Sequence, residues 1–181
     1  MSIQLFLWPI VFIQRTKQKM KKLVFLCFVG LSLASCTNES AKQAQTEADN
    51  LKFYGRVWDV VANEGRTNIL DTAFADDVVL HHTKPETKGK AGAIAYYSNY
   101  VTGFSDRKFT VVESFAKGEK LVKYWRFTGT HTGVFFGIPA TGKKVDVIGC
   151  TIAKIVDGKI TEENDFFDNL ELLQQLGLIP R

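Results

Sequence analysis

The sequence predicts an α+β fold: a curved, mostly antiparallel sheet packed against N-terminal helices, forming a cone-shaped roll with an internal cavity. Apolar residues recur at helical spacing early in the predicted domain. Strand-like runs separated by short turns fill most of the remainder, and a short helical run follows them. Helices gathered on one face of an antiparallel sheet define this class, and the space between the layers commonly holds a small ligand.

The positive net charge belongs to the N-terminal end of the chain. The formal charge is +4, from 23 Lys and Arg against 19 Asp and Glu. Five of the basic residues and none of the acidic ones lie within residues 1–36, which leaves 18 basic against 19 acidic residues. Nucleic-acid binding depends largely on phosphate contacts by Lys and Arg. A nearly neutral body therefore predicts no nucleic-acid partner.

Residues 20–35 are predicted to form a bacterial lipoprotein signal peptide. A basic Met20-Lys21-Lys22 precedes an apolar run over residues 23–33, which is of signal-peptide length and short for a bilayer span. The run ends in Leu33-Ala34-Ser35-Cys36, which resembles a lipobox. Cys36 is therefore the predicted lipidation site, and it would anchor the protein on the periplasmic or cell-surface side of a membrane. The alternative is a plain N-terminal membrane helix with an incidental Cys.

The segments on either side of this signal have different compositions. Residues 1–19 hold a second apolar run, and Met20 is a better start for a signal peptide, so we interpret residues 1–19 as an over-long start. Residues 36–50 are small and polar and are predicted to be a tether. The domain is assigned to residues 51–181. Cys150 is its single cysteine, so the domain has no internal disulfide, and we expect this thiol to be a small buried side chain.

Three helices are predicted before the main run of strands. The first carries an apolar stripe, the second is a short helix capped by Thr67 and ended by Asp76-Asp77, and the third covers residues 91–104. The stripe of the first helix consists of Leu51, Tyr54, Val57, Trp58 and Val61. A final helix is predicted over residues 169–176, with Gly177 just beyond its last turn.

Five strands are predicted, with hairpin turns at Lys117-Gly118-Glu119 and Asp157-Gly158. They cover residues 78–82, 109–116, 121–130, 145–156 and 159–167. The strand over residues 121–130 is partly apolar on both faces, whereas a sheet with one face in water alternates more cleanly. We therefore expect a second subunit to cover the outer sheet face, which predicts a homodimer.

The second half of the chain carries several motifs in a fixed order. They are Gly129-Thr130-His131-Thr132-Gly133, residues 136–143, Asp157-Gly158-Lys159-Ile160, Asp168 and residues 172–177. These motifs resemble the SnoaL-like polyketide cyclases, also labelled ester cyclases, of the nuclear-transport-factor-two-like superfamily. The likeness covers residues 51–179 and agrees with the element order.

The resemblance implies an intramolecular aldol ring closure without metal or cofactor, with an aspartate near the end of the last strand as general acid/base. An apolar cavity suits this role because desolvation raises a carboxyl pKa. Asp168 best matches the family position, and Asp165 is the alternative. They are three residues apart, so a regular strand points them to opposite faces. An Asp directly before a helix is equally a natural N-cap.

Histidines and aromatic residues complete the predicted site. Alternation places His81 and His82 on opposite faces, and we expect His81 to project into the cavity. His131 is either a loop-shaping hydrogen-bond partner or a polar wall of the pocket; as functional residues, His81 and His131 would be orienting donors. Three scattered histidines lack metal-ligand spacing, so no metal is predicted. The aromatic residues predicted to bind the ligand are Trp58, Tyr54, Tyr97, Trp125 and Phe136.

The sequence thus predicts a membrane-tethered protein that binds a small hydrophobic, oxygenated molecule. It predicts an acid/base cyclisation or isomerisation that needs no cofactor. The alternative is a non-catalytic lipoprotein that binds a ligand or docks a partner. Many relatives carry a His-Trp pair where this chain has Glu163-Asn164, a departure that leaves its substrate and chemistry open.

Overall fold

The computed structural model describes residues 39–82 and 84–180. The chain divides into two compact units, residues 1–44 and 45–181, and the fold described below is that of the second. The predicted signal peptide, Cys36 and residues 1–19 lie outside the described residues. Within the described part, no helix is both long and apolar enough to cross a membrane.

The helices of the second unit flank the strands in sequence. Residues 45–58 are helical and continue directly into the π-helical turn η1 (Asp59–Asn63). The short η2 (Thr67–Ile69) and α2 (Leu70–Ala73) follow, then the longer α3 (Lys90–Gly103), and α4 (Asn169–Gln175) comes last.

Residues 45–50, which were predicted to belong to the tether, are part of the second unit. Glu47 Oε1 accepts a hydrogen bond from the Gly118 backbone N–H at 2.8 Å, and Asn50 is buried. Gly118 lies in the turn between two strands of the sheet. The compact unit therefore includes residues 45–50 as well as the region from Leu51 onward.

A mostly antiparallel sheet forms the other layer, as the sequence predicts, although it has six strands and not the five expected. Its order is β2-β1-β6-β5-β4-β3, and the pairing of β1 with β6 is parallel while the other neighbouring pairs are antiparallel. The strands are β1 (Phe74–Leu80), β2 (Thr87–Lys88), β3 (Phe104–Lys117), β4 (Lys120–His131), β5 (Lys144–Val156) and β6 (Lys159–Phe167).

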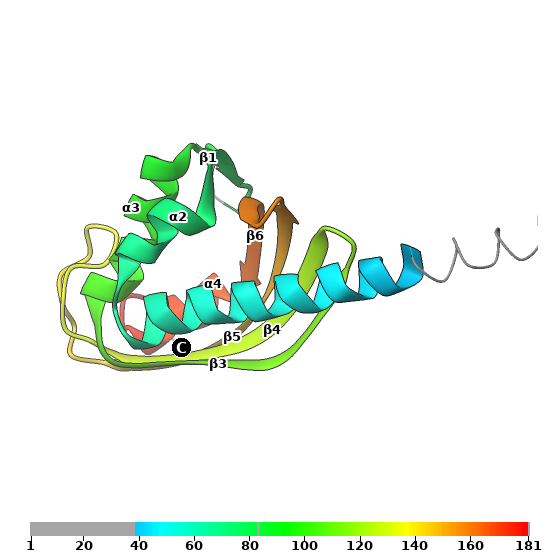
Figure 1. The fold of residues 1–181 in the computed structure, drawn as a ribbon. Helices are drawn as coiled ribbons and strands as arrows, with labels where there is room; N and C mark the ends of the chain where they lie inside the picture. Colours follow the sequence, from blue (N-terminus) through cyan, green and yellow to red (C-terminus); the bar gives the residue numbers. More distant parts are fainter. Residues whose placement is uncertain (1–38, 83, 181) are drawn as a thin grey trace, which may run out of the picture. The chain divides into compact units, whose positions relative to one another are not determined.

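The sheet is bent, and its concave side faces the helices. In Figure 1, β6 rises steeply from the layer formed by β3, β4 and β5, while α2 and α3 lie over the enclosed side. Two clusters of buried apolar side chains fill the space between sheet and helices, one around Tyr54, Leu70 and Phe74 and the other around Phe104 and Trp125. The predicted α+β architecture is therefore correct.

The turns follow the residue types that specify them. Asp157 and Gly158 both have positive φ, 48° and 70°, as a type I′ hairpin turn requires. At the end of α4, the Gly177 N–H donates to the Gln174 carbonyl and the Leu178 N–H to the Leu173 carbonyl. This is the Schellman arrangement, which the predicted glycine makes possible with φ 73°.

Two strands begin earlier than predicted: β3 at Phe104 and not at residue 109, and β1 at Phe74 and not at residue 78. Asp76-Asp77 does not end a helix, because β1 already begins at Phe74. Phe74 is fully buried and pairs with Ile160 of β6, so strand pairing decides the conformation of this stretch. The two aspartates then lie on the exposed side, and Asp76 forms an ion pair with Lys90.

Candidate active site

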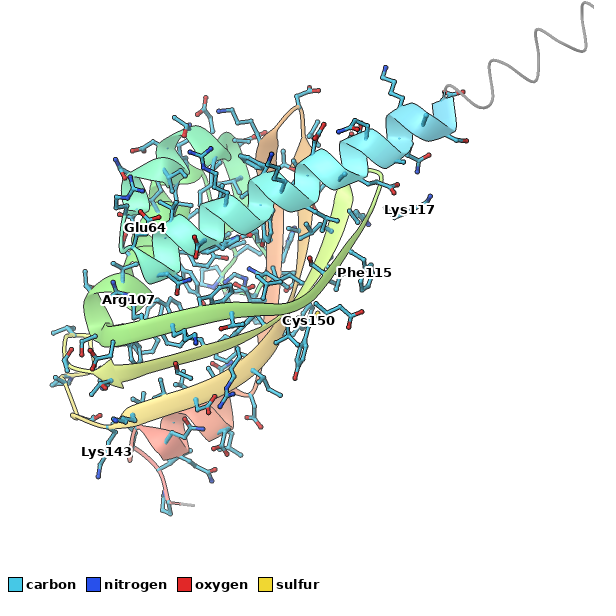
Figure 2. The ribbon with its side chains drawn as sticks, turned by 60° about the horizontal axis from the view of Figure 1, so that its bottom comes forward. Glu64, Arg107, Phe115, Lys117, Lys143 and Cys150 are labelled. Carbon is cyan, nitrogen blue, oxygen red and sulfur yellow. The ribbon has the colours of Figure 1, made fainter. Side chains whose placement is uncertain are left out.

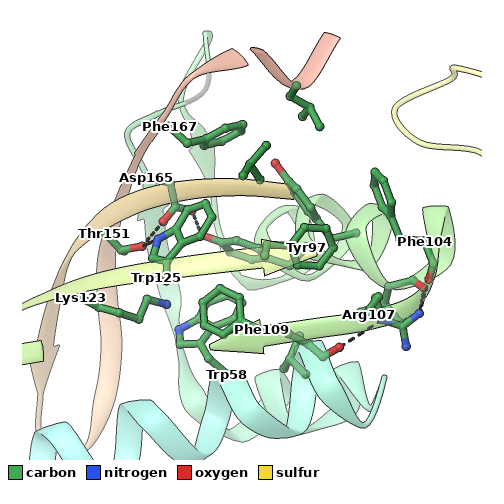
Figure 3. Close-up of a pocket in the computed structure, with 17 residues that line it drawn as sticks. Trp58, Tyr97, Phe104, Arg107, Phe109, Lys123, Trp125, Thr151, Asp165 and Phe167 are labelled. Carbon is green, nitrogen blue, oxygen red and sulfur yellow. Dashed lines mark hydrogen bonds between the residues drawn. The ribbon is translucent and has the colours of Figure 1, made fainter. Parts of the chain in front are cut away.

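A largely apolar cavity lies between the concave side of the sheet and the helices (Figure 3). Its volume is about 70 Å³, and it is partly open to solvent. Helical residues Trp58 and Tyr97 line it from one side, and Trp125 of β4 and Phe167 of β6 line it from the sheet. Its ionisable lining residues are Tyr97, Tyr100, Arg107, Lys123 and Asp165.

The predicted ligand-binding aromatics have three different positions. Trp58, Tyr97 and Trp125 line the cavity. Tyr54 is buried just outside the lining, where its hydroxyl contacts a carboxylate. Phe136 is not part of the lining, contrary to prediction: it sits in a loop with φ 46°, is 44% exposed, and its ring contacts those of Tyr96 and Tyr100 of α3.

Asp168 is an N-cap and lies outside the cavity lining. Its Oδ1 accepts a hydrogen bond from the Glu171 backbone N–H at 3.0 Å, at the first turn of α4. Of the two predicted functions for this side chain, the structural one is confirmed. Asp165, three residues earlier, lines the cavity, in agreement with the predicted opposite orientation of the two side chains.

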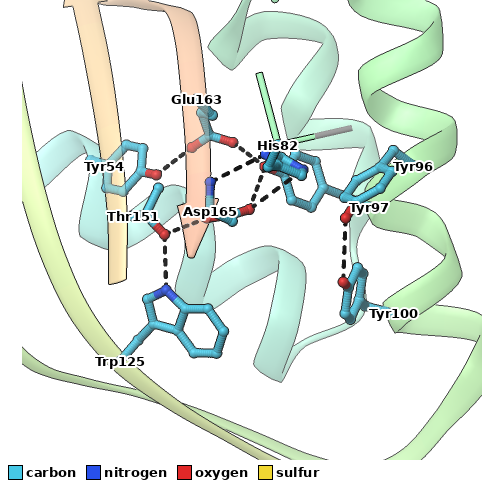
Figure 4. A network of polar contacts seen from close by, with 9 residues as sticks. All are labelled: Tyr54, His82, Tyr96, Tyr97, Tyr100, Trp125, Thr151, Glu163 and Asp165. Carbon is cyan, nitrogen blue, oxygen red and sulfur yellow. Dashed lines mark hydrogen bonds and ion pairs between the residues drawn. The ribbon is translucent and has the colours of Figure 1, made fainter. Parts of the chain in front are cut away.

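Asp165 is held by hydrogen bonds from two sides (Figure 4). Thr151 Oγ1 donates to Asp165 Oδ1 at 2.5 Å, and Thr151 in turn accepts from Trp125 Nε1 at 2.9 Å. The hydroxyl of Tyr97 lies 3.0 Å from Asp165 Oδ2. These bonds fix the carboxylate at the wall of an apolar space, which is the setting that general acid/base catalysis requires.

Glu163 is a second carboxyl of the site and was not predicted. It is fully buried on β6, two residues from Asp165, so both side chains project from the same face of the strand. The Tyr54 hydroxyl donates to Glu163 Oε1, and the Tyr97 hydroxyl lies 2.6 Å from Oε2. Burial, followed by the charge of Asp165, raises the pKa of Glu163 to about 7.

Tyr97 connects the two carboxyl groups. Its oxygen is within hydrogen-bond distance of both Glu163 and Asp165, yet a phenol has a single proton to donate. Burial, and then the charge of Asp165, raises the pKa of Tyr97 well above its usual value, so the hydroxyl stays protonated. When Glu163 is protonated, its proton can point to Tyr97, whose own proton then points to Asp165. The three groups form a path for one proton.

The histidine beside Asp165 is His82, and neither histidine lines the cavity, so the prediction that His81 projects into it is wrong. The two side chains do point apart, but His81 is half exposed and contacts Glu86 and Glu162, whose hydrogen bonds raise its pKa. His82 is only 6% exposed, and its Nδ1 accepts from the Asp165 backbone N–H at 3.2 Å.

The other ring nitrogen of His82 faces Asp165. With Nδ1 as an acceptor, the neutral ring carries its proton on Nε2, 3.9 Å from Asp165 Oδ2. Nε2 has no hydrogen-bond partner among the described residues. Burial lowers the pKa of His82, and the charge of Asp165 opposes that shift. His82 is therefore a neutral N–H donor beside the carboxylate.

His131 has the predicted structural function. It is fully buried, its Nδ1 lies 3.1 Å from Thr141 Oγ1, and its ring packs against Phe104. Burial lowers its pKa. It is not part of the cavity lining, so it shapes the loop over residues 132–143 and does not orient Asp165.

Lys123 is another residue of the site that was not predicted. Its side chain is buried among the rings of Tyr54, Trp58 and Phe109, with Nζ 4.7 Å from each ring centroid. Desolvation lowers its pKa to about 8, although Glu163 and Asp165 favour the charged form. The strand periodicity could have predicted its burial, because inward-facing residues alternate along β4 and Lys123 occupies one of those positions. Across the described residues, no group of three or more side chains is arranged to hold a metal ion.

Comparison with known proteins gives one family. A family model described as SnoaL-like polyketide cyclase matches residues 48–176. A protein designated as a SnoaL-like polyketide cyclase from Jannaschia sp. CCS1 is 25% identical, with a TM-score of 0.68, and the match covers 75% of this chain and 96% of that one. TsrD from Streptomyces laurentii is 25% identical with a TM-score of 0.65, over 72% and 97% of the two chains.

More distant structures share the fold alone. A Mycobacterium tuberculosis epoxide hydrolase of the LEH-like type is 15% identical, with a TM-score of 0.57 over 72% of this chain and 86% of that one. No functionally curated protein matches the sequence. The same roll thus carries more than one chemistry, and the site residues themselves must decide between them.

Proposed function

Because the chain belongs to the SnoaL-like polyketide cyclase family, we propose that it binds a small hydrophobic molecule with a carbonyl group and catalyses a cofactor-free proton transfer. Ring closure and isomerisation are the reactions of this kind. The proposal is carried by one observation: Asp165 lines an apolar cavity and is joined through Tyr97 to a second, buried carboxyl group.

In this mechanism Asp165 removes a proton from the carbon next to the carbonyl group. Negative charge then develops on the carbonyl oxygen, and the apolar surroundings strengthen any positive charge or N–H group directed at it. Lys123 lines the same cavity, and its ammonium form is suited to stabilise this charge. His82 is not part of the cavity lining, and its Nε2 faces the Asp165 carboxylate instead.

Asp165 returns the proton that it removed, and so acts first as base and then as acid during one turnover. Glu163 can hold this proton in between. A carboxyl group with pKa about 7 is partly ionised at neutral pH, so it can accept a proton from Asp165 and give it back. The proton moves between the two carboxyl groups through the hydroxyl of Tyr97, without passing through solvent.

The competing function is binding without turnover. It is favoured by the absence of the His-Trp pair, since Glu163-Asn164 stands in its place. A ligand-sequestering protein would use the same cavity and would keep the carboxyl groups only to hold the ligand. The two functions differ in whether the bound carbonyl compound exchanges a carbon-bound proton.

Deuterium exchange at the carbon next to a ketone tests this difference. We expect the purified chain to accelerate exchange of 2-heptanone in heavy water, and we expect Asp165→Asn to lower the rate by about 10²–10⁴-fold, the usual contribution of a general base. Nuclear magnetic resonance of the ketone follows the exchange. Asp168→Asn is the matched control, because Asn is an equally good N-cap and should keep the wild-type rate. Ketone binding without any acceleration would favour the binding function.

We also propose that the protein is anchored to a bacterial membrane through Cys36, on its periplasmic or cell-surface side. The support is the lipobox and the basic, apolar signal before it. Metabolic labelling with an alkyne fatty acid should mark the wild-type protein and place it in the membrane fraction. Cys36→Ser should remove both the label and the membrane association, and the proposal fails if the label persists in this variant.

A further inference from the structure

Lys123 has surroundings unlike those of an ordinary lysine. Its side chain is 3% exposed, lines the cavity, and ends among three aromatic rings, two of which, those of Trp58 and Phe109, are seen in Figure 3. Nζ is equally close to the rings of Tyr54, Trp58 and Phe109, at 4.7 Å. Within the described part of the chain, no carboxylate oxygen lies within ion-pair distance of this nitrogen, although Glu163 and Asp165 act on it electrostatically.

These surroundings favour an amine that can lose its proton near neutral pH. Desolvation is the main cause, and it lowers the pKa of Lys123 to about 8. A lysine in water titrates near 10.4, so at pH 7 the neutral fraction of Lys123 is larger by about two orders of magnitude. Only the neutral amine carries the lone pair needed to attack a carbonyl carbon.

We propose that Lys123 is a nucleophilic residue of this cavity that forms an imine with a bound aldehyde or ketone. The nitrogen bonds to the carbonyl carbon, and the carbonyl oxygen takes up a proton to give a carbinolamine. Loss of the nitrogen proton and protonation of the hydroxyl then release water and leave a carbon–nitrogen double bond. The balance is one carbonyl group and one amine giving one imine and one water, with no oxidant or reductant.

The groups that this step requires are nearby. Glu163 and Asp165 both influence the charge on Lys123, so an acid and a base are available for the proton movements. Once formed, a protonated imine withdraws electrons more strongly than a carbonyl group, which makes the neighbouring carbon more acidic. Asp165 would then produce an enamine, the nucleophile of an aldol ring closure. The inference deepens the proposed function, and rests on it for the binding of a carbonyl compound.

Reductive trapping tests the imine directly. The purified full chain is incubated with benzaldehyde and sodium cyanoborohydride, which converts any imine into a stable benzylated amine. Peptide mass spectrometry then gives the labelled fraction at each lysine. Benzaldehyde has no hydrogen next to its carbonyl carbon, so trapping does not depend on proton abstraction by Asp165. Lys120, exposed on the same strand, is the internal reference.

At pH 7 we expect the label at Lys123 to exceed that at Lys120 by at least tenfold. The label at Lys123 should rise with a midpoint near pH 8, where half of the amine is neutral, and level off about one pH unit higher. The labelled lysines are identified in the unaltered chain, so this measurement does not depend on the folding of a variant. Lys123→Met should abolish the preferred label, and Lys120→Met should leave it in place. Equal labelling of the two lysines, or no label at Lys123, overturns the inference.

The results also separate this inference from the proposed function. Asp165→Asn should lose ketone proton exchange and keep the label at Lys123. Preferred labelling in a chain that never exchanges ketone protons supports the imine and contradicts the proposed catalysis. Proton exchange in a chain that is not labelled at Lys123 supports the catalysis and contradicts the imine.

Discussion

Glu163 is a carboxyl group that folding removes completely from water. Its two hydrogen-bond donors are tyrosines, and burial raises its pKa to about 7 from its usual value of 4.5. The folded state therefore binds more protons than the unfolded state between about pH 4.5 and 7. Stability from this group is fully present below pH 4.5 and is lost as pH rises through 7. The difference amounts to about 3 kcal/mol, at 1.36 kcal/mol per pH unit.

Glu163→Gln should remove this part of the pH dependence, because the amide does not titrate. Urea unfolding at pH 5 and pH 8 measures it: relative to the variant, the wild-type chain should lose about 3 kcal/mol of unfolding free energy between the two conditions. Glu119→Gln, at an exposed turn position, is the control and should follow the wild-type profile. Parallel profiles for Glu163→Gln and the wild type would mean that Glu163 is ionised throughout.

Half of the candidate site follows from local sequence, and the other half requires the fold. Trp58 and Tyr97 were predicted from their helical periodicity, and Asp165 was the alternative to Asp168 for the aspartate that the family resemblance implies. Glu163, Lys123 and His82 were missed. Ionisable residues are rarely buried. Their burial here depends on partners up to 109 positions away in the sequence, as between Tyr54 and Glu163.

The histidines show why alternation alone was insufficient. Periodicity correctly separates His81 from His82 but does not state which of them faces inward. That choice is made by the pairing of β1 with β6, in which Leu80 lies opposite Glu163. Such a pairing joins distant parts of the chain in parallel, and no local pattern specifies its register.

At the scale of elements, prediction succeeded where turn chemistry is strong. β6 was predicted with its observed bounds, and β5 and α4 within one residue, because Asp157-Gly158 and Gly177 mark their ends. It failed near α2, where a four-residue helix passes directly into β1. Apolar residues in that stretch suit either state, and contacts with β6 select the strand.

β4 carries both the site and the outer surface. Its inward positions include Lys123 and Trp125, whereas Tyr124 between them is 40% exposed on the opposite face. Gly149 of β5 lies opposite Trp125, and a methyl group there would meet the indole ring at 2.4 Å. Because Gly149 has no side chain, the indole of Trp125 fits beside it and donates a hydrogen bond to Thr151. Thr151 in turn donates to Asp165.

For the whole molecule, the outer face of the sheet exposes an unusual amount of apolar surface. We define the outer patch as the exposed apolar side chains of β3 to β6 that point away from the helices, with Phe115 and the neighbouring Cys150 visible in Figure 2. Its large members are Val112, Phe115, Tyr124, Ile148, Ile152 and Phe166, with exposed fractions from 40% to 59%. Contiguous apolar patches of this kind usually mark an interface.

We propose that a second copy of the chain covers the outer patch and forms a two-fold dimer. The outer face combines the apolar side chains of the patch with the Arg126–Asp146 ion pair. In a two-fold dimer the same surface meets itself, and a surface with both a positive and a negative group can be complementary to its own copy. The cavities lie on the other side of each sheet, so pairing of the outer faces leaves them accessible. The outer patch is the sheet face that we expected, from the sequence, a second subunit to cover.

Ile152→Glu should separate the dimer, because it places a charge among the apolar side chains of the outer patch, where removal from water is costly. Sedimentation velocity should show a dimer for the wild type and a monomer for this variant, with unchanged circular dichroism. Val134→Glu is the matched control, because Val134 is similarly exposed, at 61%, but lies in the loop outside the sheet, and this variant should remain dimeric. A wild-type chain that sediments as a monomer at every concentration would contradict the dimer. If both variants sediment as monomers, the outer patch is not the interface, because a glutamate outside the sheet would then separate the dimer as well.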